Sequence, residues 1–527
     1  MHALLRISLL VLVFLPVSKT SFAEANRFTP SADTPKQPQK TLASDVREKA
    51  SKNLNQNQLL IKEYDQAIHL DPNNVEAYIK RGIAYKNLGQ HQRAIEDLNQ
   101  AIRLDPKDAR AHRNRGVAYK KLGEYQRAIT NYDRAVQLNP SYAKAYNNRG
   151  VAYKKLGRYR RAIEDYNQAI RFDPDLAVAF SNRGVAYKNL GEYKLAVEDY
   201  NQAIRIDQNM AFAFINRGNV YIKLGRYDSA VIDYNQAIHL DPNNAYAYNN
   251  RGIAYKNLGR YRDAIENYNN AIRFDPNDAE AYINRGIAFK NLGKFQRAIE
   301  DLNYAIRLDS NNASAYRNRG VAYKKAKEYR RAIEDYDQAI RLNPKYAKAY
   351  NNRGVAYKKL GDYERAIEEY DQAISLAPDF AAAYNNRGIA YKNLGKYQRA
   401  IDDYSQALRL DPNIAFAYFN RGNIYIKLGQ YNMAIADYDQ AIQLDSDDAE
   451  AHNNRGVAYR NLGRLKEAIS DFDQAVRLDP YYVEAFNNRG NLHINSGNHA
   501  RACDDFLKAC ELGDCAKLWF AKGNGDC

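Results

Sequence analysis

The stretch AKAYNNRGVAYKKLGRYRRAIEDYNQAIRFDPDL, residues 143–176, decides the fold of this chain. We expect one helix over 143–156 that stops at Gly157, and a second over 159–172 that stops before Pro174, because glycine and proline break helices. Small residues and tyrosines recur along both predicted helices. Two closely packed helices need such a pattern, because a bulky ring must meet a gap in the facing helix.

This stretch recurs with a constant period along most of the chain. The pair Arg-Gly returns thirteen times at intervals of 34 residues, from Arg81-Gly82 to Arg489-Gly490, without an insertion or a deletion. A constant period of this length is typical of stacked repeats, in which each unit packs only on its neighbours. We number the positions of each repeat from 1 to 34, so that the first repeat begins at Val75 and the last at Val483.

The recurring residues resemble the tetratricopeptide repeat at nearly every signature position. In residues 143–176 the matching set is Tyr146, Gly150, Tyr153, Ala162, Tyr166, Ala169 and Pro174. The resemblance implies an all-α superhelix, a solenoid of thirteen helix-turn-helix repeats over 75–512, with a partial repeat helix over 58–74 and a cysteine-rich cap over 513–527. It also implies a protein that is not an enzyme and that binds other proteins or extended peptides in a concave groove.

The N-terminus has the features of a processing segment. Arg6 precedes a short apolar run, and small residues predict cleavage by a signal peptidase after Ala23, with a cut after Ala25 as the alternative. We therefore expect residues 1–23 to be a signal peptide and residues 24–57 a flexible leader. The sequence predicts an exported bacterial protein that does not span a membrane. The expected location is the periplasm, with a secreted or outer-surface protein as the alternative.

Position 6, on the side of the first helix that would line the groove, is asparagine in twelve of the thirteen repeats. Asparagine is a poor choice inside a helix, and its carboxamide offers a donor and an acceptor to a peptide backbone. The row resembles the asparagine ladder in the solenoid of the O-linked N-acetylglucosamine transferase. A role in stabilising the helices, or simple copying of the residue by duplication, would also account for the row. The predicted ladder consists of Asn114, Asn148, Asn182, Asn216, Asn250, Asn284, Asn318, Asn352, Asn386, Asn420, Asn454 and Asn488.

Positions 12 and 13 of the same side are rich in lysine. Position 12 is lysine in nine repeats and arginine in a tenth, and position 13 is always asparagine or lysine. This pattern predicts a basic groove that attracts acidic partners, although a merely solvated lysine face is the alternative. The clearest examples are Lys120, Lys121, Lys154, Lys155, Lys324, Lys325, Lys358 and Lys359.

Two repeats carry apolar residues on this otherwise polar side. The stretch from Phe212 to Leu224 is echoed by Phe416 to Leu428, and this offset of 204 residues indicates that a block of six repeats was duplicated. Exposed apolar patches usually mark contacts. We expect two matching apolar pockets that each anchor a hydrophobic side chain, with self-association through the same patches as the alternative. Their residues are Phe212, Ile215, Ile222, Phe416, Phe419 and Ile426.

Position 7 is always arginine, where the resembled family usually has leucine. Position 23 on the second helix is aspartate in ten repeats, Glu369 in one, and Asn131 and Asn267 in two. A partly buried arginine needs a partner, so we expect a pair within each repeat, such as Arg149 with Asp165. An arginine row that grips an anionic ligand is the alternative.

All four cysteines lie in the last 25 residues, which predicts disulfides in an exported protein. Cys503 and Cys510 are too far apart on one helix to bond each other. Two pairings remain open: Cys503–Cys515 with Cys510–Cys527, or Cys503–Cys527 with Cys510–Cys515. The disulfides are expected to hold a capping segment whose Leu518 and Trp519 cover the open end of the solenoid.

Motifs for catalysis, metals and nucleic acids are missing from the sequence. It contains no Gly-rich phosphate loop, no His-Glu-x-x-His and no nucleophile elbow. His499 and Cys503 lack an accompanying Cys-x-x-Cys motif, so we predict no metal and no cofactor. The net charge of +16 suits polyanions, but export and the lack of stacking aromatics beside the lysines argue against nucleic acid.

Two functions follow from the sequence. The first is a scaffold that binds extended acidic peptide segments and assembles or guides an envelope complex. The second is a component of a machine that makes or exports polysaccharide, binding an acidic polysaccharide or its synthase. Salt dependence separates them, because polyanion binding falls steeply with salt.

Overall fold

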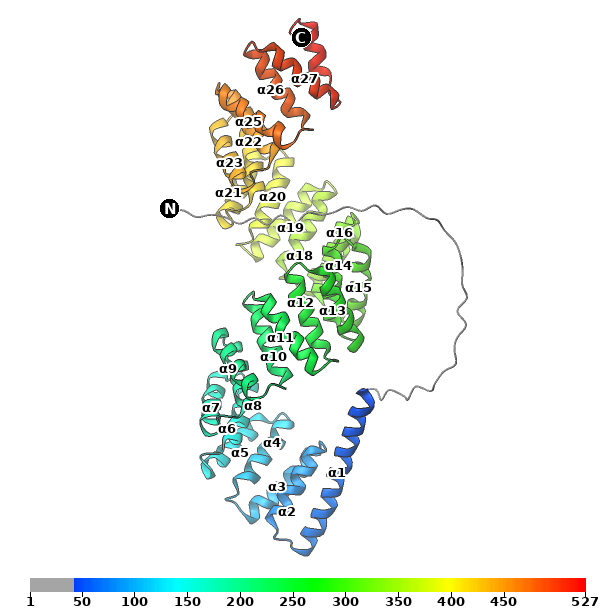
Figure 1. The fold of residues 1–527 in the computed structure, drawn as a ribbon, viewed down its shortest axis with the longest axis vertical. Coiled ribbons are helices and arrows are strands. Elements are labelled where there is room, and N and C mark those ends of the chain that lie inside the picture. Colours follow the sequence, from blue (N-terminus) through cyan, green and yellow to red (C-terminus); the bar gives the residue numbers. More distant parts are fainter. Residues whose placement is uncertain (1–41) are drawn as a thin grey trace, which may run out of the picture. The chain divides into compact units, whose positions relative to one another are not determined.

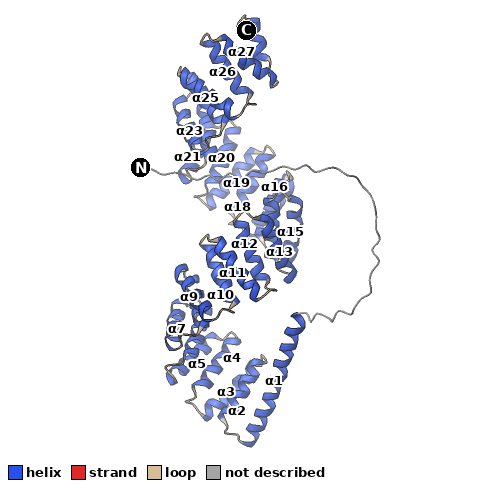
Figure 2. Cartoon of the chain, in the orientation of Figure 1, coloured by secondary structure: helices blue, strands red, loops and turns tan. Residues whose placement is uncertain are grey.

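The computed structural model describes residues 42–527, with side chains from residue 54 onward. The predicted signal peptide and the first part of the predicted leader lie outside the described residues. The described part of the chain is entirely helical, with 28 helices, α1–α28, and no strand (Figures 1 and 2). None of its helices is long and apolar enough to cross a membrane. The chain divides after Leu138 into two compact units.

The first unit holds a long N-terminal helix and the beginning of the repeats. Helix α1 runs through the end of the predicted leader and the predicted partial repeat without a break, and it packs on α2. Its helices are α1 (Leu42–Leu70), α2 (Val75–Asn87), α3 (His91–Leu104), α4 (Ala109–Lys121) and α5 (Tyr125–Leu138).

The second unit continues the same period of helix pairs to the C-terminus. First helices of its repeats are α6 (Ala143–Lys155), α8 (Ala177–Asn189), α10 (Ala211–Lys223), α12 (Ala245–Asn257), α14 (Ala279–Asn291), α16 (Ala313–Lys325), α18 (Ala347–Lys359), α20 (Ala381–Asn393), α22 (Ala415–Lys427), α24 (Ala449–Asn461) and α26 (Val483–Asn495). Second helices are α7 (Tyr159–Phe172), α9 (Tyr193–Ile206), α11 (Tyr227–Leu240), α13 (Tyr261–Phe274), α15 (Phe295–Leu308), α17 (Tyr329–Leu342), α19 (Tyr363–Leu376), α21 (Tyr397–Leu410), α23 (Tyr431–Leu444), α25 (Leu465–Leu478) and α27 (His499–Glu511). A last helix, α28, spans Ala516–Gly523.

Within each unit, a second helix packs against the first helix of its own repeat and against the first helix of the repeat that follows it in that unit. The predicted helix boundaries in residues 143–176 are confirmed to within one residue. Gly157 closes the turn between α6 and α7 with a φ of 73°, a left-handed conformation that favours glycine. The expected tetratricopeptide architecture of stacked helix pairs is therefore confirmed.

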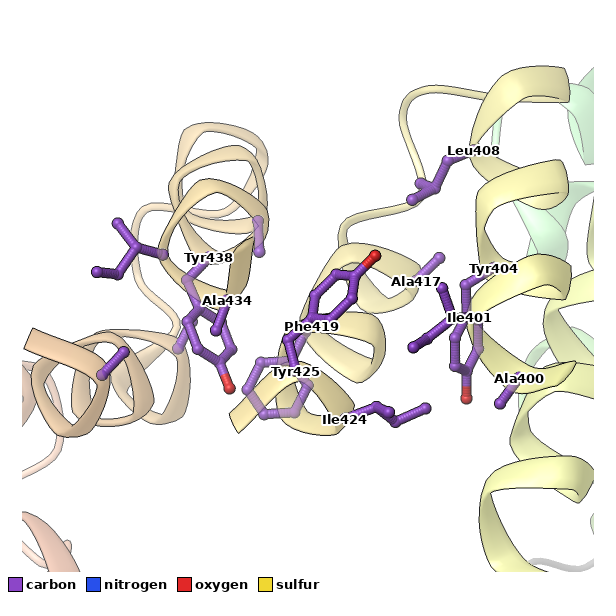
Figure 3. Close-up of a cluster of buried hydrophobic side chains, with 14 residues drawn as sticks. Ala400, Ile401, Tyr404, Leu408, Ala417, Phe419, Ile424, Tyr425, Ala434 and Tyr438 are labelled. Carbon is purple, nitrogen blue, oxygen red and sulfur yellow. The ribbon is translucent and has the colours of Figure 1, made fainter. Parts of the chain in front are cut away.

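A glycine of the first helix interlocks with a large side chain of the second, which is tyrosine in most repeats and leucine or phenylalanine in the others. Tyr166 is fully buried in α7, and a Cβ atom added to Gly150 of α6 would lie 2.7 Å from its Cε1 atom. The ring therefore fills the space that only a glycine leaves open. The same pairing recurs through the second unit, and Figure 3 shows one stretch of the resulting core, from Ala400 to Tyr438.

The arginine at position 7 ties neighbouring repeats together. The guanidinium of Arg183 donates 2.9 Å and 2.6 Å hydrogen bonds to Asp199 of its own repeat and a third, of 2.6 Å, to Asn167 of the preceding repeat. The predicted pair of Arg149 and Asp165 is confirmed, with a contact of 2.6 Å. Burial raises the pKa of the Asp199 carboxyl, and the bonds from Arg183 oppose that shift. The row is thus engaged within the chain, as a structural role requires.

Two disulfides hold the C-terminal cap. They join Cys503 to Cys527 and Cys510 to Cys515, which is the second of the two expected pairings. Leu518 is buried against α27, as expected, but Trp519 is 70% exposed, so the prediction that it covers the solenoid end is wrong. At about 100° per residue, a helix that turns Leu518 and Ala521 inward must turn Trp519 away.

Candidate functional site

The side chains that the sequence predicts to bind lie along the first helices of the repeats. Most of the asparagines at position 6 are buried or half-buried, and the lysines at position 12 are half-buried. The lysines at position 13 of the predicted basic groove are exposed. Both units present this row, and each is described by its own contacts.

Most of the asparagines at position 6 are held by one of two kinds of hydrogen bond, although the amide nitrogen of Asn148 is buried without a partner among the described residues. In one kind the amide donates to the backbone carbonyl four residues earlier, as Asn216 does to Phe212 at 2.9 Å. In the other it donates to the asparagine at position 5 of the preceding repeat, as Asn386 does to Asn351 at 3.1 Å. These bonds orient the carboxamides and compensate for the poor helix propensity of asparagine.

The lysines at position 12 join this network. The amine of Lys358 donates a 3.1 Å hydrogen bond to the Oδ1 atom of Asn386 in the next repeat. The amine of Lys392 donates a 2.6 Å hydrogen bond to the Oδ1 atom of Asn420. Sequence reasoning placed the two rows on one side but did not predict that they bond to each other. A carboxamide has two N–H donors and two acceptor sites. The bonds to Asn351 and Lys358 leave one donor and one acceptor of Asn386 for a ligand.

Burial makes the amines at position 12 weaker bases than a free lysine. It lowers the pKa of Lys120, Lys324 and Lys358 to about 8, and neighbouring cationic side chains add to the shift. At neutral pH these amines remain mostly protonated. A half-dry row of ammonium groups attracts carboxylates more strongly than a fully solvated row does.

Cavities border this row in the second unit. Two of them lie at the two repeats that carry apolar substitutions, and a smaller one, of about 400 Å³, lies at regular repeats beside Lys290, Asn291 and Lys325. The first pocket has a volume of about 490 Å³ and lies among α8, α10 and α12; its lining includes Lys188, Asn219, Ile222, Lys223, Tyr246 and Asn250. The second pocket has a volume of about 600 Å³ and lies among α20, α22 and α24; its lining includes Lys392, Asn423, Ile426, Lys427, Asn454 and Glu484.

The predicted apolar residues divide among three environments. Ile222 and Ile426 line the pockets. Ile215 and Phe419 are 7% exposed and belong to the core beneath, where the Phe419 ring lies 6.0 Å from that of Tyr438. Phe212 and Phe416, the remaining two, are more than half exposed and are not among the residues that line either cavity. Both pockets are therefore less apolar than their sequence pattern indicates.

An asparagine at position 9, where the regular repeats have valine or isoleucine, organises each pocket. Asn219 accepts a 2.7 Å bond from the hydroxyl of Tyr234, and Asn423 accepts a 2.6 Å bond from that of Tyr438. In the described part of the chain the corresponding hydroxyl is buried without a partner at Tyr132, Tyr166, Tyr200, Tyr268, Tyr336, Tyr370 and Tyr404. The substitution at position 9 was the available sequence signal for these two residues.

Both of these repeats carry a larger residue at position 10. Regular repeats have alanine there, packed on the second helix of the preceding repeat, but these two have Val220 and Ile424. Ile424 points from α22 toward Ala400 and Tyr404 of α21 (Figure 3). The wider side chain acts as a wedge, and α22 packs less closely on α21 than in the regular repeats.

Among the described residues, no group of three or more histidine, cysteine, aspartate or glutamate side chains is arranged to hold a metal ion. His499 instead lies 3.1 Å from the carboxylate of Asp526, and Cys503 is in a disulfide.

Comparison with protein families finds repeated matches along the chain. Profiles described as TPR repeat match residues 84–123, 118–157, 218–259, 254–293, 288–327, 323–361 and 422–463. Profiles described as tetratricopeptide repeat match residues 63–96, 143–176, 177–210, 347–380, 381–414, 404–436, 449–482 and 483–512. No curated protein matches the chain.

Several solved structures are similar to parts of the chain. The Cut9-Hcn1 hetero-tetramer of the APC/C is 17% identical, with a TM-score of 0.42, over 83% of this chain and 93% of that one. MamA from Desulfovibrio magneticus RS-1 is 28% identical, with a TM-score of 0.31, over 32% and 94%. YrrB, described as a TPR protein with an unusual peptide-binding site, is 25% identical, with a TM-score of 0.30, over 36% and 96%.

Proposed function

Because the chain belongs to the tetratricopeptide repeat family, whose fold implies protein–protein interaction, we propose that it is a scaffold that binds extended acidic peptide segments along its first helices. Proteins built from such repeats are generally non-catalytic. The proposal concerns the finer points: the chemistry of the ligand, the residues that hold it and the location of the complex.

The network of position 6 and position 12 is the observation that carries the proposal. Lys358, Asn386 and Asn351 form one connected set across two repeats, and Lys392 with Asn420 continues it. Such a set offers a peptide backbone a donor and an acceptor, and it offers an acidic side chain an ammonium group beside them. Because the set recurs with the repeat, an extended ligand can meet it several times.

The affinity of such a row depends on how many contacts a ligand makes. Each hydrogen bond to a carboxamide contributes about 1 kcal/mol net, so eight contacts would reach roughly micromolar affinity before ordering costs. Ordering a flexible peptide offsets part of that gain. Anchoring sites in addition to the row are therefore expected.

The proposed location is the bacterial envelope, where the protein would assemble or guide a complex. The predicted signal peptide over residues 1–23 supports export. The two disulfides of the C-terminal cap support an oxidising compartment such as the periplasm.

An acidic polysaccharide is the second candidate ligand, and the exposed lysines at position 13 favour it. A polysaccharide would meet these charges without using the oriented carboxamides. Its binding would then vanish at moderate salt, whereas a peptide held by the carboxamides would keep part of its affinity.

The test is a selection of twelve-residue peptides from a random display library, using residues 24–527. We expect acidic sequences to be enriched. Synthetic copies should bind at least tenfold more weakly, on the order of 0.5 kcal/mol per lysine, when the position 12 residues Lys120, Lys154, Lys324 and Lys358 are changed to Gln. Fluorescence anisotropy at low and moderate salt measures the affinity.

A matched control removes the same charge from the second helices, with Arg127, Arg161, Arg331 and Arg365 changed to Gln. This control should leave the affinity unchanged. The proposal fails if neither variant changes binding, or if heparin binds in place of peptides and is released completely by moderate salt.

A further inference from the structure

We propose that the second unit carries two related binding sites, the first and second pockets, which hold two copies of one peptide segment with an acidic side chain beside an aliphatic one. This inference rests on the proposed function and deepens it. It identifies the two pockets as the anchoring sites that a peptide needs in addition to the row of asparagines and lysines.

The two pockets are built from the same residues. Lys188, Asn219 and Ile222 of the first pocket recur as Lys392, Asn423 and Ile426 of the second, 204 residues later in each case. The pairing of the position 9 asparagine with a buried tyrosine hydroxyl is repeated as well, at 2.7 Å and 2.6 Å. Because residues and geometry both recur, a ligand that fits one pocket fits the other.

Three positions distinguish these two repeats from the regular ones, and the last repeat shares the changes with Asn491, Leu492 and Ile494. The larger side chains of Val220 and Ile424 wedge the helices apart, and Asn219 and Asn423 satisfy a tyrosine that stays unpaired elsewhere. Isoleucine at position 12 then replaces a lysine and gives the opening an aliphatic wall. The cavity at the regular repeats, beside Lys290, Asn291 and Lys325, has no such wall. Packing of a regular solenoid does not require the change.

The chemistry of the lining specifies the occupant. In the first pocket the aliphatic wall is Ile222 and Ile253, and the amines of Lys188 and Lys223 stand beside it. The Lys188 ammonium has three donors, and the structure gives one of them to Asn216 at 3.3 Å. The remaining donors can bind a carboxylate while the aliphatic wall takes an apolar side chain.

The pockets differ in one respect that predicts unequal affinity. Tyr246 lines the first pocket, whereas the corresponding position of the second repeat block is Glu450, and Glu484 also lines the second pocket. The field of Glu450 acts on Lys392, raising the pKa of that amine while burial lowers it more. Carboxylates near the second pocket repel an acidic ligand, so the first pocket should bind it more tightly.

The test is calorimetric titration of residues 24–527 with a capped peptide of sequence Glu-Leu-Glu-Leu-Glu. We expect two molecules bound per chain. The first pocket is removed by Asn219→Val with Ile222→Lys, and the second by Asn423→Val with Ile426→Lys, which restore residues of the regular repeats. Each double variant should bind one molecule, and the fourfold variant none at the same concentration.

Controls make the result specific to the pockets. The same exchanges in the last repeat, Asn491→Val with Ile494→Lys, should leave two molecules bound. Glu450→Tyr should tighten the weaker site at least threefold and bring the two affinities together. Peptides with Gln for Glu, or Ser for Leu, should each bind at least tenfold more weakly.

Three outcomes overturn the inference. One is a single bound molecule in the wild-type chain. Another is binding that the pocket variants leave unchanged while the variant of the four position 12 lysines abolishes it. In both cases the proposed function survives. The third is a dimer of the chain, seen by light scattering, that the pocket variants dissociate, which would assign the pockets to self-association. If no acidic peptide binds the wild-type chain, the proposed function itself fails.

Discussion

At the scale of the residue, arginine at position 7 replaces an apolar residue with a polar junction. Arg183 is 19% exposed and its partner Asp199 is 5% exposed, so the pair is largely removed from water. Burying two charges costs free energy that their attraction only offsets when the remaining donors are also satisfied. The contact with Asn167 of the preceding repeat supplies that last bond. The buried ion pair is therefore tolerated, because Asp199 and Asn167 together accept the hydrogen bonds of the Arg183 guanidinium.

We predict that Asp199→Ala destabilises the repeat by about 3 kcal/mol, because it leaves a buried guanidinium without its carboxylate. Asp199→Asn should cost less than about 1.5 kcal/mol. Asparagine already occupies this position in another repeat, where the Arg115 guanidinium donates a 2.6 Å hydrogen bond to Asn131. Hydrogen–deuterium exchange of α8 and α9 measures both effects, and equal losses of protection in the two variants would contradict the prediction.

Sequence reasoning at this scale succeeded for partners within a repeat and failed for partners across repeats. The Arg149 and Asp165 pair followed from the need of a buried charge for a partner. The link from Lys358 to Asn386 did not follow, because it depends on how far successive first helices are displaced. Phe212 shows the same limit: helical periodicity placed it on the right side, but only packing decides which side chains border a cavity.

At the scale of the element, the turn between the two helices of a repeat is closed by a residue in a left-handed conformation. Twelve of these turns use glycine, at φ values between 70° and 85°. The eighth repeat uses Lys327, at φ 65°, between α16 and α17. A side chain in this conformation costs free energy, because its Cβ atom approaches a backbone carbonyl. One turn of the solenoid is therefore under strain.

We predict that Lys327→Gly stabilises this repeat by about 1 kcal/mol, because glycine adopts the left-handed conformation without that clash. The reverse change in the next repeat, Gly361→Lys, has open space around it and should cost a similar amount. Urea denaturation gives both values. A lower midpoint for the Lys327→Gly variant would show that the lysine side chain stabilises the turn by contacts that outweigh the strain.

At the scale of the whole molecule, the repeat period fixes the fold, whereas departures from the period mark the candidate sites. The fold could be predicted because thirteen copies in register leave one way to stack. The repeats of the two pockets could be singled out, since Ile222 and Ile426 break the lysine pattern, although Ile494 breaks it as well. The polar lining of the pockets could not be predicted, because Lys188 and Lys392 reach the pockets from the neighbouring repeat.

The row of half-buried lysines predicts how stability depends on pH. Burial holds the pKa of Lys120, Lys324 and Lys358 at about 8 in the folded chain, below the ordinary value of 10.5. Between pH 8 and 10 the unfolded chain therefore binds more protons than the folded chain. The free energy of unfolding should rise with pH across this window.

The check is thermal unfolding from pH 7 to pH 10. The wild-type chain should become more stable over this range, and changing the three lysines to Met should make the gain smaller. Binding of an acidic peptide should weaken over the same range, because the row loses charge. A wild-type melting temperature that falls steadily from pH 7 would contradict the assignment.

The arginine junction also constrains how a gene for such a chain can change in length. Each arginine reaches sixteen residues forward and sixteen residues back, as Arg285 does to Asp301 and Asn269. Recombination that adds or removes whole repeats leaves every arginine with both partners, whereas an insertion within a helix turns an arginine away from one of its partners. The duplication of six complete repeats, 204 residues, obeys that rule. Unequal crossing-over in register is thus the route by which such a family can gain ligand sites without refolding the rest.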